Sequence, residues 1–163
     1  KIDVAGEANG VIEIDLFEDL APAHAAQITA LAAEGQYDGV VFHRVIDGFM
    51  AQTGDVKFGR IGADMRNAGM GGSSLPDLKA EFSDRSFERG IVGMARSQSP
   101  NSANSQFFIM FAAAPHLNGQ YTVFGRVTKG MEHVDAVKKG DQALNGQVRD
   151  PDTIIKMRTA DKY

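Results

Sequence analysis

The stretch FHRVIDGFMAQTGD, residues 42–55, decides how this chain is interpreted. Its first part, extended backward to VVFHRVI over residues 40–46, is rich in branched and aromatic side chains and predicts a β-strand. Asp47 and Gly48 are typical of a tight turn, and the short run 49–53 follows them. The stretch therefore predicts a strand and a turn with a basic pair of residues inside an apolar run.

Similar short apolar runs recur on both sides of this stretch. VIEIDLF, residues 11–17, alternates apolar and acidic side chains and predicts a half-buried strand. Four more short strands are expected, at residues 91–96, 106–111, 122–127 and 152–159. Many short strands separated by turns are typical of a sheet protein and not of a helical bundle.

Two helices are expected, one early and one late in the chain. Pro22 suits the first turn of a helix, where its missing N–H costs nothing, and Gly35 is placed to end that helix. Its inward face carries Ile28, Leu31 and Ala32. The later helix covers residues 131–138, with Met131, Val134 and Val137 at helical spacing. The pattern as a whole predicts a mainly β fold, a closed antiparallel barrel with a helix over each end.

The bulk composition is that of one ordinary globular domain, residues 1–163. The chain has 17 Lys and Arg against 21 Asp and Glu, a net charge of −4, and no basic block, so no nucleic-acid partner is expected. The absence of Cys excludes disulfides and thiolate chemistry.

No apolar run approaches the roughly 20 residues that span a bilayer, so no membrane association is expected. No targeting segment is visible, which favours the cytoplasm, although the chain begins at Lys1 and a removed signal peptide would leave the periplasm open.

The common catalytic and cofactor motifs are missing. The four His residues, at positions 24, 43, 116 and 133, form no HExxH pair, so no metal site is expected. The chain has no GxSxG elbow, P-loop or GxGxxG cradle. We therefore expect no cofactor.

The basic pair His43-Arg44 remains as the candidate for chemistry. Strand alternation sends the two side chains to opposite faces. Taken alone, the strand favours a solvated or ion-paired arginine on the outer face, because an unpartnered arginine is costly to bury. Several apolar and amide side chains nearby suggest instead a small apolar pocket with directed hydrogen bonds. These are Phe49, Met50, Gln52, Gln106, Phe107 and Phe108.

Three motifs together resemble the cyclophilin family of peptidyl-prolyl cis-trans isomerases. They are FHRVIDGFMAQTGD at 42–55, SANSQFFI at 102–109 and YTVFGRV at 121–127. The resemblance runs in order from about Val11 to Thr159. Any one tripeptide from these motifs would be a weak signal, but a joint match of this length is specific.

The resemblance implies a closed eight-stranded antiparallel β-barrel capped by two α-helices, with a groove for proline on its outer surface. It makes Arg44 the catalytic residue. A hydrophobic pocket for the proline ring is implied for Phe49, Met50, Phe108 and Leu117. Gln52 and Gln106 correspond to groups that hold the arginine and the substrate backbone, Ala95, Arg96 and Ser97 to the edge that pairs with the peptide, and His43 to a histidine lining the groove. Proline-containing peptides and folding proteins would be the substrates of this enzyme, which we expect to be a monomer.

The chain departs from the family pattern at three places. His116 stands where many eukaryotic members have Trp, and Tyr121 where they have His; these two changes predict weak cyclosporin binding at most. Arg96-Ser97 replaces the commoner Asn-Ala. The departures, together with DLKAEFSDRSFERG at 77–90, look like a bacterial member of the family.

Two rival functions and one segment stay open at this stage. A chaperone-like module that holds proline segments without turnover would use the same groove, although the retained Arg44 favours an enzyme. A barrel that carries a small ligand would need an open lumen, whereas the abundant Phe and branched residues predict a filled interior. The insert at 56–67 is interpreted as either a mobile rim of the groove or, preferably, a solvated loop.

Overall fold

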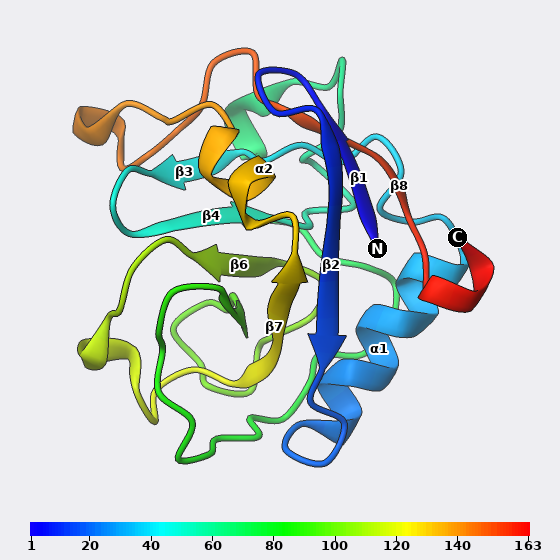
Figure 1. Ribbon diagram of the computed structural model, residues 1–163, viewed down its shortest axis with the longest axis vertical. Helices are drawn as coiled ribbons and strands as arrows, with labels where there is room; N and C mark the ends of the chain where they lie inside the picture. The colour runs from blue at the N-terminus through cyan, green and yellow to red at the C-terminus, as the bar shows by residue number, and fades with distance from the viewer.

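The computed structural model describes residues 1–163 and is built around one sheet of eight strands (Figure 1). The strands lie in the order β3-β4-β6-β5-β7-β2-β1-β8, and every pairing is antiparallel. Their bounds are β1 Ile2–Ala5, β2 Gly10–Leu16, β3 Arg44–Ile46, β4 Met50–Thr53, β5 Ile91–Met94, β6 Phe107–Met110, β7 Val123–Lys129 and β8 Thr153–Met157. The α-helices are α1 Pro22–Ala33 and α2 Met131–Ala136. None of the helices is long and apolar enough to cross a membrane.

The sheet is curled but open, so the expectation of a closed barrel is wrong. Strands β3 and β8 stand at the two ends of the strand order and do not form a ladder with each other. The predicted strand at 40–46 divides, and only its last part becomes β3. Val40 and Val41 instead form isolated bridges, to Arg60 and to Thr153 of β8 respectively, and no ladder joins β3 to β8. The result is a half-barrel of antiparallel strands with two helices.

Alternation along single strands supplies two separate apolar layers. Phe107 and Ile109 of β6 belong to a cluster of 26 buried residues that fills the inside of the curl. Phe108 and Met110, their neighbours on the same strand, point to the other face and belong to a second cluster of eight residues. The second cluster lies outside the main core, and its exposed side forms the base of the site described below.

Helix α1 begins at Pro22 as predicted, and Ile28 and Leu31 are buried on its inward face. Its N-cap residue provides no side-chain hydrogen bond. The carboxylate of Glu81, from the long loop before β5, accepts hydrogen bonds from His24 N at 2.9 Å and from Ala23 N at 3.3 Å. A distant acidic side chain thus satisfies the free N–H groups that begin this helix.

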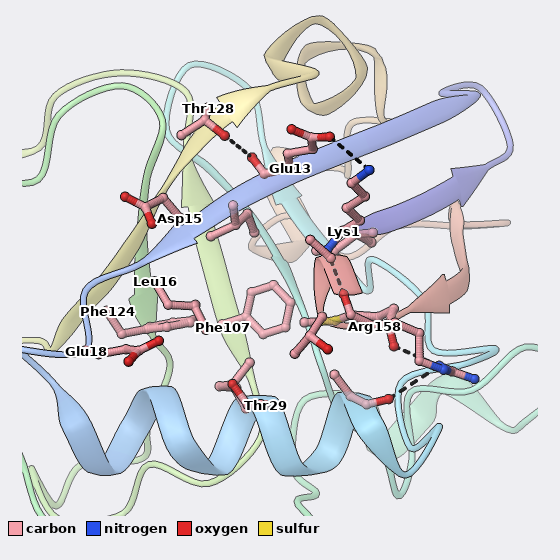
Figure 2. A pocket seen from close by; sticks show the side chains of 17 residues that line it. Lys1, Glu13, Asp15, Leu16, Glu18, Thr29, Phe107, Phe124, Thr128 and Arg158 are labelled. Atoms are coloured by element: carbon pink, nitrogen blue, oxygen red, sulfur yellow. Dashed lines mark hydrogen bonds and ion pairs between the residues drawn. The ribbon is translucent and has the colours of Figure 1, made fainter. Parts of the chain in front are cut away.

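A hollow of about 490 Å³ lies between α1 and the sheet (Figure 2). Phe107 and Phe124 form its inner wall, and Thr29 points into it from the helix. Lys1 and Glu13 pair across its rim at 3.3 Å. The hollow contains none of the site residues predicted from the sequence.

Candidate functional site

Arg44 and Gln52 face the same side of the sheet because they are direct cross-strand partners in the β3–β4 ladder. Gln52 is in turn the partner of Phe108 on β6. His43, one residue before Arg44, is buried with 6% of its surface exposed, whereas Arg44 is partly exposed. The two basic side chains therefore separate, as the alternation of the strand predicts.

Hydrogen bonds fix the guanidinium of Arg44 on two sides. Nη1 donates to Gln52 Oε1 at 3.1 Å. On the opposite side, Nε donates to the backbone carbonyl of Asn145 at 3.0 Å and Nη2 to its side-chain Oδ1 at 3.1 Å. A guanidinium carries five N–H donors, so three are engaged and two remain free. Burial lowers the pKa of Arg44 from its ordinary value, but an arginine stays charged at any physiological pH.

A relay of amides continues from Gln52 into the loop before β5. Gln52 Nε2 donates to Gln106 Oε1 at 3.0 Å. Gln106 Nε2 donates to the carbonyls of Gly69 and Gly71 at 2.9 and 2.8 Å. Gln52 and Gln106 are therefore held in one orientation each, with every polar atom that faces the relay satisfied.

The relay is anchored by Asp55, whose carboxylate is fully buried. Its Oδ2 accepts from Gly69 N at 2.8 Å and from Gly71 N at 3.0 Å. Its Oδ1 accepts from Lys57 N and Phe58 N, at 3.1 and 2.8 Å. Four backbone donors around one carboxylate tie both ends of the 56–71 loop to the end of β4.

Next to Arg44 lies a cavity of about 330 Å³, which we call the proline pocket after the role the sequence predicts for it. The second apolar cluster forms its base. Its lining residues are Arg44, Phe49, Met50, Gln52, Ala95, Arg96, Phe108, His116, Leu117 and Tyr121, all of them named by the sequence analysis. The structure thus brings together ten of the thirteen predicted site residues, while His43, Ser97 and Gln106 stand outside the lining.

Aromatic contacts shape the walls of the proline pocket. The rings of Phe49 and His116 lie 5.7 Å apart, and Tyr121 meets Phe108 edge to face at 5.9 Å. The guanidinium of Arg96 stacks on the Tyr121 ring at 4.4 Å and donates to the carbonyl of Gln120 at 2.8 Å. Arg96 is thereby folded back onto the protein, where it forms a wall and not a mobile charge.

A strand edge borders the pocket where β5 ends. Ala95 N donates to the carbonyl of Gln106 at 3.0 Å, but the N–H and the carbonyl of Arg96 itself have no partner within the chain. Ser97 N donates instead to Ser102 Oγ at 2.9 Å. Beyond this edge lies a polar hollow of about 580 Å³, which Ser97 and Gln106 help to line. The two unpaired backbone groups can bind one residue of an extended peptide.

His43 lies under the groove as a neutral side chain. Burial lowers its pKa from 6.5 to about 4, against an opposing effect of the Asp55 carboxylate. Neither ring nitrogen has a hydrogen-bond partner. A neutral, buried imidazole of this kind is not poised for acid–base chemistry at neutral pH.

The sequence analysis missed Asn145 and Asp55. Asn145-Gly146 is a dipeptide typical of a tight turn, and Asn145 indeed adopts the left-handed conformation, with φ of 56°. The dipeptide therefore signals the turn, but only the fold shows that the turn faces Arg44. No group of three or more His, Cys, Asp or Glu side chains is placed to hold a metal ion.

Comparison with known proteins gives consistent matches over most of the chain. Residues 1–159 match the family model described as cyclophilin type peptidyl-prolyl cis-trans isomerase/CLD. A probable peptidyl-prolyl cis-trans isomerase of Brucella suis is 63% identical over 150 residues, which cover 91% of this chain and 76% of the relative. A peptidyl-prolyl cis-trans isomerase of Arabidopsis thaliana is 43% identical over 146 residues, covering 83% of this chain and 84% of the relative.

Among solved structures, a cyclophilin of Cryptosporidium parvum, crystallised in the presence of the dipeptide Ala-Pro, superposes with a TM-score of 0.76 at 30% identity. The match covers 90% of each chain. Fold, family model and curated relatives agree, and the chain belongs to the cyclophilin-type peptidyl-prolyl cis-trans isomerases.

Proposed function

We propose that this enzyme binds the proline ring of its substrate in the proline pocket and that Arg44 stabilises the twisted transition state of the X-Pro bond. The observation that carries this proposal is the guanidinium itself. It is fixed from two sides at the rim of an apolar cavity, and two of its N–H groups are left free.

The chemistry requires electrostatic stabilisation and no covalent step. Rotation about an amide costs about 18–20 kcal/mol because the nitrogen lone pair is delocalised into the carbonyl. At the twisted transition state the lone pair returns to the prolyl nitrogen, which becomes pyramidal and can accept a hydrogen bond. A fixed guanidinium that donates to this nitrogen stabilises the transition state more than the planar ground state. The proposed step moves no proton, electron or group, so it requires no cofactor.

The substrate chain follows from the same geometry. Steric contact with the proline ring forces the residue before proline into an extended conformation, which suits pairing with the free N–H and carbonyl of Arg96. Proline itself has no N–H and cannot continue such a ladder. We infer that residues before the proline lie along this edge, that residues after it leave past Arg44, and that the substrates are proline-containing peptides and folding proteins.

The arrangement supports weak binding of cyclosporin at most. His116 lies against Phe49 at a position where many eukaryotic relatives carry a larger Trp, and a smaller ring offers less apolar contact. We further propose that residues 1–163 act as one monomeric domain.

The test compares isomerisation of a short Ala-Pro peptide by the wild type, Arg44→Ala and Arg44→Lys at equal concentrations of folded protein. An acceleration of ~10⁵ by the wild type would correspond to about 7 kcal/mol of transition-state stabilisation. We expect both variants to lose most of this acceleration. Alanine has no donor, and the ammonium of lysine does not reproduce the planar donor geometry of a guanidinium. Arg126→Ala, which removes an exposed arginine from β7, is the matched control and should keep full activity. Full activity in folded Arg44→Ala would contradict the mechanism, and a folded wild type without turnover would indicate a proline-binding module instead.

A further inference from the structure

A second cavity, with both polar and apolar lining residues, adjoins the proline pocket on the far side of Arg44. It measures about 450 Å³, and we call it the flanking cavity. It shares Arg44 and Gln52 with the proline pocket but neither Ala95 nor Arg96, so it meets the pocket only across the arginine. Its apolar residues include Met65 and Met70 from the loop before β5 and Leu144 and Val148 from the segment after α2. Arg66, Asn145 and Gln147 of the same two segments also line it.

The walls of the flanking cavity expose large apolar side chains to solvent. Met70 is 77% exposed and Leu144 is 56% exposed, two of the highest values among the large apolar residues. Exposed apolar side chains that face one another across a concave surface mark an interaction site far better than scattered ones do. Methionine walls are also adaptable, so they select an apolar side chain without demanding one shape.

Both walls are rigidly attached to the frame that holds Arg44. The turn that carries Leu144 is bound to β3, because Val45 N donates to the carbonyl of Gly146 and Gly140 N to that of Val45, each at 2.8 Å. The opposite wall is anchored through the N–H of Gly69, adjacent to Met70, on the buried carboxylate of Asp55. The flanking cavity is therefore preformed, as ligand-binding cavities usually are.

We propose that the flanking cavity is a substrate subsite that takes a large apolar side chain, such as Leu, Met or Phe, located two or three residues after the proline. The proposal rests on the proposed function, because it uses the direction in which the substrate crosses the groove. Residues before the proline occupy the Ala95–Arg96 edge, so the chain after it passes over Arg44. An extended chain advances about 3.3–3.6 Å per residue, so a cavity that shares a wall with the proline pocket is within two or three residues.

The experiment measures kcat/KM for an all-alanine peptide around one proline and for the same peptide with Leu at the second or third position after the proline. We expect the better leucine peptide to exceed the alanine peptide by about fivefold in the wild type, the range that partial burial of one aliphatic side chain gives. Leucine at the equivalent positions before the proline serves as the directional control.

Leu144→Ser and Met70→Ser are the test variants, and each should bring the leucine-to-alanine ratio close to one. Ile155→Ser is the matched control, because Ile155 on β8 is 53% exposed, close to the 56% of Leu144, and lies outside both cavities. It should keep the wild-type ratio.

The outcomes that would contradict the subsite differ from those that would contradict the proposed function. A ratio near one in the wild type, or a high ratio that survives Leu144→Ser, would overturn the subsite while the alanine peptide is still turned over. A preference only for leucine before the proline would also overturn it. Loss of turnover of the alanine peptide itself would contradict the proposed function. In that case calorimetric binding of the two peptides tests the subsite alone, where equal affinities would overturn it.

Discussion

Asn145 binds the guanidinium of Arg44 through both its backbone carbonyl and its side chain, although the two residues are 101 positions apart in the sequence. Gln52 holds the same guanidinium from the opposite side. The arginine is thus clamped between strand β4 and a turn that follows α2. Because Asn145 and Gln52 bind different N–H groups of the guanidinium, the contribution of each residue can be tested separately.

Replacing Asn145 by alanine should lower kcat about tenfold and affect KM less, because a lost hydrogen bond to a charged group is worth roughly 1.5 kcal/mol and the proline pocket remains intact. Asn145 has φ of 56°, a conformation that alanine tolerates poorly. Asn145→Gly is therefore the matched variant, since glycine accepts this conformation. Equal losses in both variants identify the amide oxygen as the cause, whereas normal activity in the glycine variant would attribute the loss to backbone strain.

Gln52→Glu should reduce kcat about tenfold without unfolding the protein. The new carboxylate would neutralise part of the charge of Arg44, on which stabilisation of the prolyl nitrogen depends, and it would no longer donate to Gln106. Steady-state assays of an Ala-Pro peptide, with circular dichroism to verify the fold, measure the effect. Unchanged kcat in the glutamate variant would mean that the arginine does not act through its charge.

Asp55→Asn should destabilise the protein by about 3 kcal/mol, because the new amide group presents donors to backbone N–H groups that are themselves donors. Urea denaturation measures this loss. Asp64→Asn makes the same chemical change at an exposed ion pair with Arg66 and should leave the midpoint unchanged. Equal midpoints for the two variants would contradict the anchoring role of Asp55.

The buried His43 should make the protein less stable in mild acid. Its pKa is about 4 in the folded protein and 6.5 as the reference value, so the folded state favours the neutral ring. Above pH 6.5 neither state binds the proton and the contribution is zero. As the pH falls from 6.5 to about 4, only the unfolded state becomes protonated, and stability falls by about 3 kcal/mol in total.

Urea denaturation at intervals between pH 7 and pH 4 measures this loss, with His43→Gln as the reference because it cannot titrate there. As the pH falls, the unfolding free energy of the wild type should decrease more than that of the variant. Parallel curves over this range would show that His43 does not carry the dependence.

Much of the fold follows from the sequence, because period-two alternation and helix punctuation are local signals. Helix α1 begins at Pro22 as expected, and the strand expected at 11–17 is found as β2. Strand β1 was missed because it has only four residues and its pairing with β8 contains a register shift, which leaves too little pattern to detect. The closed barrel, which both the strand pattern and the resemblance implied, was wrong because the contact between the two ends of the sheet joins distant residues and has no local signal in the sequence.

The residues of the site also fall into those that sequence motifs predict and those that only the folded structure brings together. The proline pocket was predicted because six of its residues belong to the three motifs and the resemblance extends along the chain to the other four, Ala95, Arg96, His116 and Leu117. The clamp on Arg44 was not, because Asn145 comes from a turn whose position relative to β3 depends on the whole topology. The flanking cavity escaped for the same reason, since Met70 and Leu144 are separated in sequence and meet only in the folded chain.

The pairing of β1 with β8 joins Ile2 to Met157, the first strand of the chain to the last. During synthesis β1 can pair with β2 early, but its other edge stays open until residues 153–157 have left the ribosome. An unpaired edge of this kind is a template for wrong association, and contacts between distant residues slow folding. This isomerase therefore completes its own sheet only after residues 153–157, which form β8, have been synthesised.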